Sequence, residues 1–237
     1  MRWNNRHPFG RPAVFDRLVL RRAALRYAAH GWAVTPGACF AGHRFTCGRP
    51  GCPIMGCHPA TESWEDDACS DPAQVAHWWR RRPYTVLLAT GWTFDVLEVP
   101  AAMGLRVLGT ARLHAGLLGP ERADVGGPVA VTADERWMFL VRPGVALRSE
   151  LARCPHVVLH GRGSWVPAAP SQAPGGPVRW AVSPERVHWR LPDPEAVQTM
   201  LIDALDTTGR RPMAPAPTRR PVPVAVPRQM STTRRAA

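Results

Sequence analysis

The chain has 237 residues, of which 45% are hydrophobic and 20% are charged, which suffices for one well-buried core but hardly for two full domains. Its formal net charge is +12, because 30 basic residues, all of them arginine, oppose 18 acidic ones. No apolar run reaches the roughly 20 residues of a membrane span, and the first residues lead into no signal-peptide core. We therefore expect a soluble, cytoplasmic protein without a membrane partner.

The positive charge is concentrated at the two ends of the chain. Residues 1–13 hold three arginines and no acid, residues 207–237 hold seven arginines and no acid, and the middle keeps 20 arginines against 18 acids. Both ends have too few large apolar residues to offset the entropy of ordering. We predict disordered basic segments at 1–13 and 207–237 around one domain at 14–206. Such ends suit loose contact with phosphate, although arginine without lysine is also what codon bias in a GC-rich genome produces.

The first predicted elements are a helix over about 16–30, with Asp16 as its N-cap, and a short strand at 32–34 that Pro36-Gly37 closes. Residues 39–64 show no hydrophobic periodicity and carry many Gly, Pro and Cys residues. We therefore expect a long loop that needs an internal cross-link.

A second helix is predicted to open at Ser70-Asp71-Pro72 and to end at Arg80-Arg81-Arg82-Pro83. The periodicity of the remaining chain predicts strands at 85–89 and 94–99, a helix over about 101–118, a hairpin of 128–132 with 137–141, strands at 156–160, 164–169 and 178–182, and a closing helix at 193–205. The fold class is therefore α+β, with a mixed or antiparallel sheet and flanking helices.

The cysteine-rich segment 39–64 gathers five potential zinc ligands. Cys39, Cys47, Cys52 and Cys57 are separated by seven, four and four residues, and His58 follows directly. Thiolates with an imidazole suit structural Zn²⁺, which can fold a loop that lacks an apolar core, whereas disulfides are disfavoured in a reducing cytoplasm.

We expect Cys47, Cys52 and Cys57 to be the surest ligands, with Cys39, His43 or His58 completing the site. The alternative interpretation is a set of free, partly buried thiols. A catalytic thiol is less favoured, because the sequence assigns no histidine to activate one. Cys69 and Cys154 read as small core residues.

Five segments, in their order along the chain, resemble the bifunctional DNA primase/polymerase N-terminal domain family. The resemblance covers roughly residues 18–205. The segments are Gly31-Trp32-Ala33-Val34, the loop ending in Cys57-His58-Pro59-Ala60, Ser70-Asp71-Pro72 to Trp78-Trp79, Leu88-Ala89-Thr90-Gly91 with the strand at 94–99, and Gly161-Arg162-Gly163-Ser164-Trp165 to Ser171.

The resemblance implies an archaeo-eukaryotic primase-type fold with an RRM-like core. Such domains join nucleotides on a DNA template, using two divalent metals, Mg²⁺ or Mn²⁺, that acids hold. Two carboxylates of one strand that coordinate the same metal pair must lie two residues apart, because side chains at i and i+2 point to the same face of a strand.

This chain departs from that pattern at three places. Glu98 takes the place of the first acid, but Pro100 stands at the second and Val158 near the third. The family's nucleotide-contacting histidine falls near Trp137. Asp95 does not repair the pair with Glu98, because residues three apart on a regular strand point to opposite faces.

The remaining candidates for function are basic side chains near turns. Arg136, His160 and Arg162 could meet phosphate, and the alternative is ordinary surface charge. Glu98 could equally be a lone exposed strand carboxylate, and Asp95 an aspartate beside a turn. Trp165 reads as core rather than as a platform for stacking bases.

Three functions follow from these observations. The first is a catalytically degenerate primase/polymerase-like domain that binds DNA, RNA or nucleotides in a replication or mobile-element context, with zinc stiffening its loop. The second is an active nucleotidyltransferase in which Glu98, with Asp95 or Asp134, holds Mg²⁺ or Mn²⁺. The third is a zinc-stabilised protein-interaction module. Without lysine the chain has no Walker-type motif, so any helicase must be a separate partner.

Overall fold

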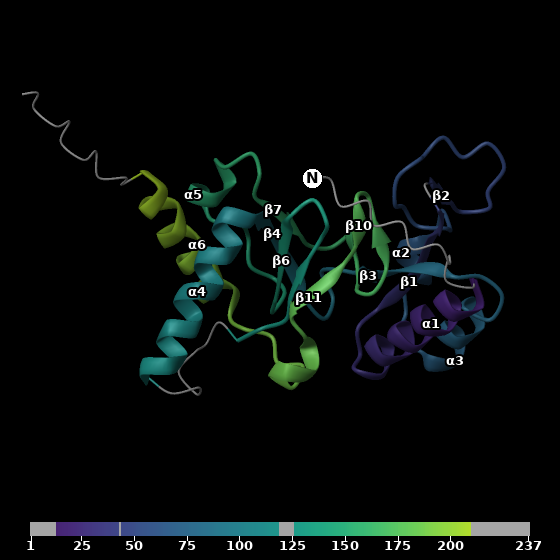
Figure 1. The fold of residues 1–237 in the computed structure, drawn as a ribbon, viewed down its shortest axis with the longest axis horizontal. Helices are drawn as coiled ribbons and strands as arrows, with labels where there is room; N and C mark the ends of the chain where they lie inside the picture. The colour runs from purple at the N-terminus through teal and green to yellow at the C-terminus, as the bar shows by residue number, and fades with distance from the viewer. Residues whose placement is uncertain (1–12, 43, 119–125, 210–237) are drawn as a thin grey trace, which may run out of the picture.

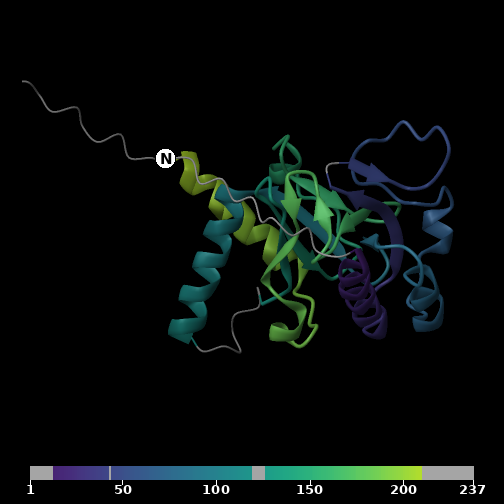
Figure 2. The same ribbon diagram turned by 45° about the vertical axis from the view of Figure 1, so that its right-hand side comes forward.

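The computed structural model describes residues 13–42, 44–118 and 126–209. Two antiparallel sheets lie at the centre, with α1 and α3 at one end of the molecule and α4 and α6 at the other (Figures 1 and 2). The predicted α+β class with flanking helices is thereby confirmed. The basic ends predicted at 1–13 and 207–237 lie outside the described residues, except for Ala13 and residues 207–209.

Six α-helices and one 3-10 turn are described: α1 (Ala13–Ala29), α2 (Trp64–Asp67), α3 (Pro72–Trp78), α4 (Ala101–Leu118), α5 (Ser149–Ala152), η2 (Pro184–Val187) and α6 (Pro194–Gly209). None of the described helices has both the length and the apolar character that a membrane crossing requires.

The first sheet has the strand order β2-β1-β3-β8, and all its pairs are antiparallel. Its strands are β1 (Val34–Ala41), β2 (Arg44–Thr46), β3 (Tyr84–Ala89) and β8 (Trp165–Pro167). α1 and α3 pack against it, and the side chains of Trp32, Trp79, Val86 and Leu88 lie in the shared core.

The second sheet has the order β11-β5-β6-β4-β7 and is also antiparallel throughout. Its strands are β4 (Asp95–Pro100), β5 (Val129–Val131), β6 (Arg136–Val141), β7 (Val158–His160) and β11 (Arg179–Val182), and a separate hairpin joins β9 (Gln172–Ala173) to β10 (Gly176–Pro177).

The two faces of the second sheet bury different cores because side chains alternate along a strand. Leu97, Val99 and Phe139 pack against residues of α4 and α6. Val96, Met138 and Leu140 instead join the core that α1 and the first sheet share. Side chains on this second face therefore point toward the first sheet.

The chain crosses between the sheets at two adjacent turns. β3 passes to β4 through residues 90–94, and β7 returns to β8 through 161–164. Thr90 binds both arms of the returning turn: its backbone N–H donates to the Ser164 carbonyl at 3.0 Å and its Oγ1 to the Gly161 carbonyl at 2.6 Å. We call this place the sheet junction, and residues 90–94 and 161–164 define it.

Two local predictions are wrong. α1 begins at Ala13, so Asp16 lies in its first turn and is not its N-cap. β1 also continues through Pro36 and Gly37 instead of ending there. Proline is tolerated because its partner Val86 directs its backbone N–H and C=O away from β1, to Ser171 and Ala168.

The other predicted elements agree with the structure within a few residues, and two of them agree in detail. Asp71 caps α3 by accepting hydrogen bonds from the N–H groups of Ala73 and Gln74, with Pro72 at the first position. The hairpin predicted at 128–132 and 137–141 is β5 paired with β6. Residues 39–64 include β2 and the end of β1, so they are only partly loop.

Candidate functional site

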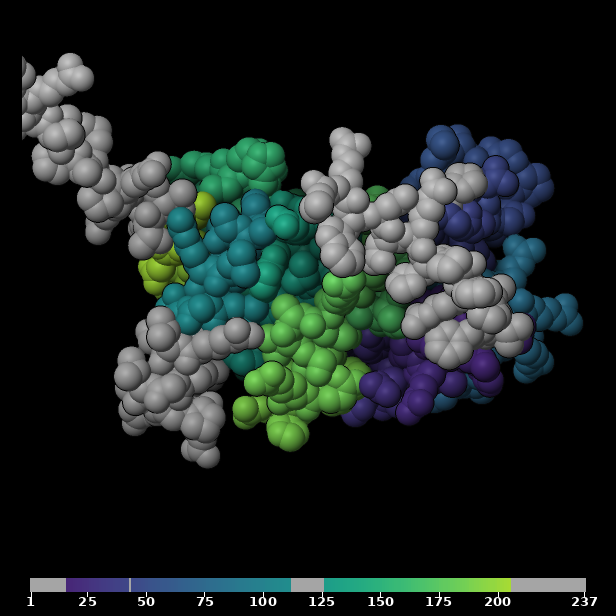
Figure 3. Space-filling view, viewed as in Figure 1, coloured from purple at the N-terminus to yellow at the C-terminus, as the bar shows by residue number. Residues whose placement is uncertain are grey.

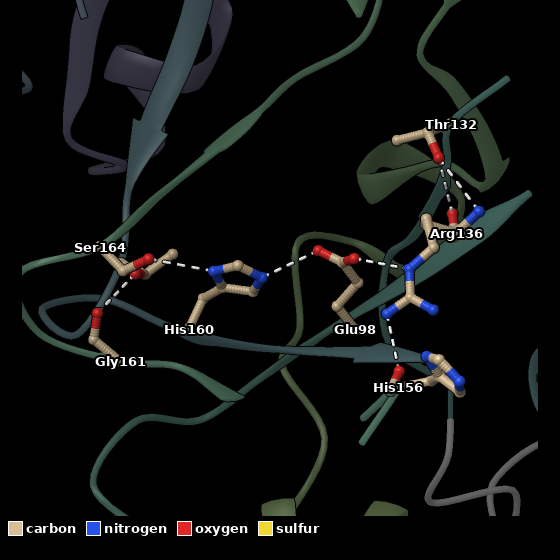
Figure 4. Close-up of polar contacts among 8 residues, drawn as sticks. Glu98, Thr132, Arg136, His156, His160, Gly161 and Ser164 are labelled. Atoms are coloured by element: carbon tan, nitrogen blue, oxygen red, sulfur yellow. Dashed lines mark hydrogen bonds and ion pairs between the residues drawn. The ribbon is translucent and has the colours of Figure 1, made fainter. Parts of the chain in front are cut away.

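Glu98 lies on β4 between the guanidinium of Arg136 and the imidazole of His160, and it is not the lone exposed carboxylate that was one interpretation of the sequence. Its Oε1 accepts a hydrogen bond from Arg136 Nε at 2.7 Å, and its Oε2 accepts one from His160 Nε2 at 2.8 Å (Figure 4). The side chains of Glu98, Arg136 and His160 are each about a fifth exposed. All three come from neighbouring strands of the second sheet, on the face that points toward the first sheet.

The side chains of Arg136 and His160 are both held by further contacts. Arg136 Nη2 donates to the His156 carbonyl at 2.7 Å, and the Arg136 backbone N–H donates to Thr132 Oγ1 at 3.0 Å. His160 Nδ1 lies 3.0 Å from Ser164 Oγ at the sheet junction (Figure 4). Because an ionised carboxylate only accepts hydrogen bonds, His160 Nε2 carries a proton and Ser164 meets the other ring nitrogen.

These contacts fix the charge of Glu98. The hydrogen bond from His160 is the largest effect on its carboxyl, and with Arg136 it outweighs the opposing effect of burial and lowers the pKa of Glu98 to about 2. Glu98 is therefore ionised at neutral pH with both oxygens occupied.

The residues around Glu98 do not fit a divalent metal pair. A metal ion would have to displace His160 and Arg136, and the Arg136 guanidinium, which stays charged, would repel it. Pro100 and Val158 occupy the adjacent positions on the same face, and neither offers an oxygen side chain. Asp134 is exposed in the turn between β5 and β6.

Asp95 lies on the opposite face of β4 from Glu98, as the strand alternation predicted. Its side chain is buried and Oδ2 accepts a hydrogen bond from the Gly144 N–H at 2.9 Å, while Oδ1 has no partner. Trp137 also lies on that face and packs against the core under α4. The hairpin residue that faces Glu98 is therefore Arg136, not the Trp137 to which the resemblance pointed.

Arg162 lies in the returning turn of the sheet junction. Its guanidinium carbon lies 4.1 Å from the ring centroid of Trp92, which is 51% exposed. This is a cation–π contact on the surface beside His160 and Ser164. The arginine therefore has a preferred position, although no acid within the described part of the chain pairs with it, and the half-exposed indole is a functional candidate that the sequence did not single out. Trp165, predicted as core, is half-buried.

Gly91→Ala is expected to destabilise the protein by about 2–4 kcal/mol, because Gly91 has a φ of +87° and an added Cβ would overlap the backbone of Arg162. Urea unfolding of the variant measures this loss. Gly109→Ala is the control: an exposed helical position with open space around it, where alanine should add up to about 1 kcal/mol. Equal stability of the two variants would contradict the close packing of the two turns.

The cysteine-rich segment holds a second cluster. Among the described residues, Cys47, Cys52 and His58 form the one group of three potential metal ligands whose ligand atoms all lie within 4.8 Å of one another. His58 is 3% exposed, and its Nδ1 lies 2.7 Å from the Gly56 carbonyl. Because that oxygen only accepts, Nδ1 carries the proton in the neutral ring, and Nε2 presents its lone pair to Cys52 Sγ at 3.5 Å.

The Cys47 thiol of this cluster has a lowered pKa. Burial alone would raise the pKa of Cys47, but hydrogen bonding, in the first place from Arg49, outweighs it and lowers that pKa to about 6. Arg49 Nε lies 3.5 Å from Cys47 Sγ and its Nη2 lies 3.9 Å from Cys52 Sγ. The cluster is thus suited to thiolates, the form in which cysteine binds a metal.

The other predicted ligands are outside this group. Burial raises the pKa of Cys57 to about 12 and that of Cys39 to about 11, which favours neutral thiols at both. His43 lies outside the described residues. The structure therefore brings together Cys47, Cys52 and His58. Cys57, which was expected to be among the surest ligands, lies outside this group. Cys69 and Cys154 are half-buried and pack against the two main cores.

Comparison with known proteins agrees with the resemblance that the sequence motifs indicated. A family model described as bifunctional DNA primase/polymerase, N-terminal, matches residues 24–219. No curated protein and no solved structure matches the chain.

Proposed function

The chain belongs to the bifunctional DNA primase/polymerase N-terminal domain family, and from that premise we propose that it binds nucleic acid or nucleotide without joining nucleotides. The observation that carries this proposal is the occupation of both Glu98 oxygens, by Arg136 and by His160. Where the family's chemistry needs a pair of acids, this chain has one carboxylate inside an ion pair, with Pro100 and Val158 beside it.

The charge around Glu98 supports binding of phosphate. Arg136 neutralises Glu98, while Arg162 lies at the neighbouring turn with no acidic partner among the residues that the structure describes. A phosphate oxygen can accept hydrogen bonds from a guanidinium, and the half-exposed Trp92 offers a ring on which a base can stack. We call Arg136, His160, Arg162 and Trp92 the junction site.

Zinc has a structural part in this proposal. Cys47, Cys52 and His58 fit Zn²⁺ in donor type and spacing, and the imidazole tautomer is the one that such a site needs. Zinc would supply cross-links to a segment that shares only a small buried apolar cluster: Ala38, Phe45, Cys47 and Ala60.

Purified protein is expected to incorporate no labelled nucleotides on a primed or unprimed DNA template, with either Mg²⁺ or Mn²⁺. The physical reason is that one paired carboxylate cannot assemble the two-metal site on which the transfer depends. Glu98→Ala should give the same background, and a family member with both acids serves as the positive control. Incorporation that Glu98→Ala abolishes would instead establish an active nucleotidyltransferase.

Binding distinguishes this function from that of an interaction module without a nucleic-acid role. The measurement is fluorescence anisotropy with a labelled oligothymidylate over a range of salt concentrations, because phosphate contacts weaken steeply with salt. Arg162→Ala should lower the affinity, while Arg190→Ala, which removes an exposed arginine elsewhere, should leave it nearly unchanged. Affinity that does not vary with salt would exclude nucleic acid as the partner.

A further inference from the structure

A basic pocket lies where α3 ends, away from the junction site. Its volume is about 340 Å³, and its lining residues are His77, Trp78, Arg80, Arg81, Arg82 and Tyr84. None of these lining residues is acidic. We call it the α3 pocket.

The three arginines of the α3 pocket are exposed, and none of them pairs with an acid in the part of the chain that the structure describes. No ion pair or side-chain hydrogen bond within the described ranges engages Arg80, Arg81 or Arg82, whereas Arg26, Arg49, Arg136, Arg142 and Arg148 each pair with an acid. Three uncompensated guanidinium groups in succession create a strongly positive surface that attracts a polyanion.

The aromatic walls of the pocket are fixed by a buried residue. Trp79 is fully buried, and its indole N–H donates to the Tyr84 carbonyl at 2.7 Å. Trp78 and Tyr84 each make an edge-to-face contact with Trp79, with centroid distances of 6.3 and 6.4 Å, and both remain half-exposed. The pocket therefore has preordered rings beside its arginines.

The α3 pocket adjoins the cysteine-rich segment. The Arg82 guanidinium packs closely against Gly48, the residue that follows the candidate ligand Cys47. A Cβ added at Gly48 would overlap this guanidinium. Figure 3 shows this segment and the residues that follow α3 together on the surface at the right-hand end of the molecule, opposite α4 and α6.

We propose that the α3 pocket is a second contact for single-stranded nucleic acid, in which Arg80, Arg81 and Arg82 bind consecutive phosphates and an unpaired base stacks on Trp78 or Tyr84. The proposal rests on the proposed function in taking nucleic acid as the partner. Arginine alone would serve any polyanion, but ordered rings next to unpaired guanidinium groups favour a single strand, whose bases are free to stack.

The test compares four full-length variants by anisotropy with a labelled oligothymidylate of about 20 nucleotides. The pocket variant carries Arg80→Ala, Arg81→Ala and Arg82→Ala. The matched control carries Arg179→Ala, Arg186→Ala and Arg190→Ala, which removes three exposed arginines that likewise form no ion pair with any described residue. The junction variant carries Arg162→Ala.

The pocket variant should bind about 10- to 100-fold more weakly than the wild type at low salt, and the slope of log affinity against log salt should fall by about 2, as three lost single-strand phosphate contacts require. The control should lose less than about threefold. Trp78→Leu should weaken single-strand binding with the salt slope unchanged, because stacking releases no counterions.

The outcomes separate the two proposals. Weaker binding in the pocket variant alone supports the α3 pocket and overturns the junction site, and weaker binding in the junction variant alone does the reverse. Equal losses in the pocket variant and its control would mean that only net charge matters, which overturns the α3 pocket. A pocket variant that keeps its affinity for the oligothymidylate but loses affinity for a labelled duplex of the same length, measured in the same way, would overturn it as well.

Discussion

Glu98→Ala is expected to destabilise the protein by about 2–3 kcal/mol, measured by urea unfolding at neutral pH. The change would leave Arg136 and His160 facing each other without the carboxylate that separates them, and each of these side chains is only about a fifth exposed. Removing one partner from a largely buried pair costs more than the pair itself contributes, because the remaining charge stays poorly solvated.

The matched control is Glu185→Ala. Glu185 pairs with Arg26 at 2.8 Å, but both side chains are more than 40% exposed, so this loss should stay below about 1 kcal/mol. If Glu98→Ala were as stable as the wild type, the Glu98 ion pairs would not be structural, and a role in binding a metal would regain support.

We expect the stability of the protein to depend on pH in the acid range because of Glu98. Its pKa is lowered to about 2 in the folded protein from 4.5 in the unfolded chain. The stabilisation from Glu98 is therefore complete above about pH 4.5 and disappears as the pH falls through about 2. The difference in unfolding free energy between the wild type and Glu98→Gln should shrink over this interval, and a constant difference would contradict the ionised pair.

Cys47→Ser and Cys52→Ser are each expected to reduce bound zinc from about one equivalent per chain to nearly none, measured by atomic emission on protein purified without chelators. Each change removes a thiolate from a group of three ligands, and two remaining side chains hold Zn²⁺ weakly. Hydrogen exchange in residues 44–60 should become faster, because the small apolar cluster there offers little independent stability.

Cys69→Ser and Cys154→Ser are the controls, since both thiols lie outside the cluster. They should keep full zinc content. Cys57→Ser and Cys39→Ser test whether a fourth thiolate joins upon binding: retained zinc in both would leave the three-residue set intact, and a loss in one would identify the fourth ligand. If the purified wild-type protein contained no zinc and residues 44–60 still exchanged their amide hydrogens slowly, the free-thiol interpretation would be favoured.

Local sequence signals were sufficient for most of the secondary structure. The cap Asp71-Pro72, the pattern of α6 and the hairpin of β5 and β6 each depend on neighbouring residues, whose propensities act over a few positions. Strand alternation also predicted that Asp95 and Glu98 would point to opposite faces. The continuation of β1 through Pro36 was missed. Proline is acceptable there because its partner on β3, Val86, directs its backbone N–H away from β1, to Ser171, and the sequence of β1 alone does not reveal this.

The sequence alone determined the α+β class, the family and a cysteine-rich segment able to bind metal, because composition, motif order and short-range spacing encode them. Only the tertiary structure decided that Glu98 lies between Arg136 and His160, which are 38 and 62 residues away in the chain. It also decided that His58, rather than Cys57, joins Cys47 and Cys52. Such contacts depend on strand register and on how two sheets pack, and these are set by the burial of side chains distant in sequence.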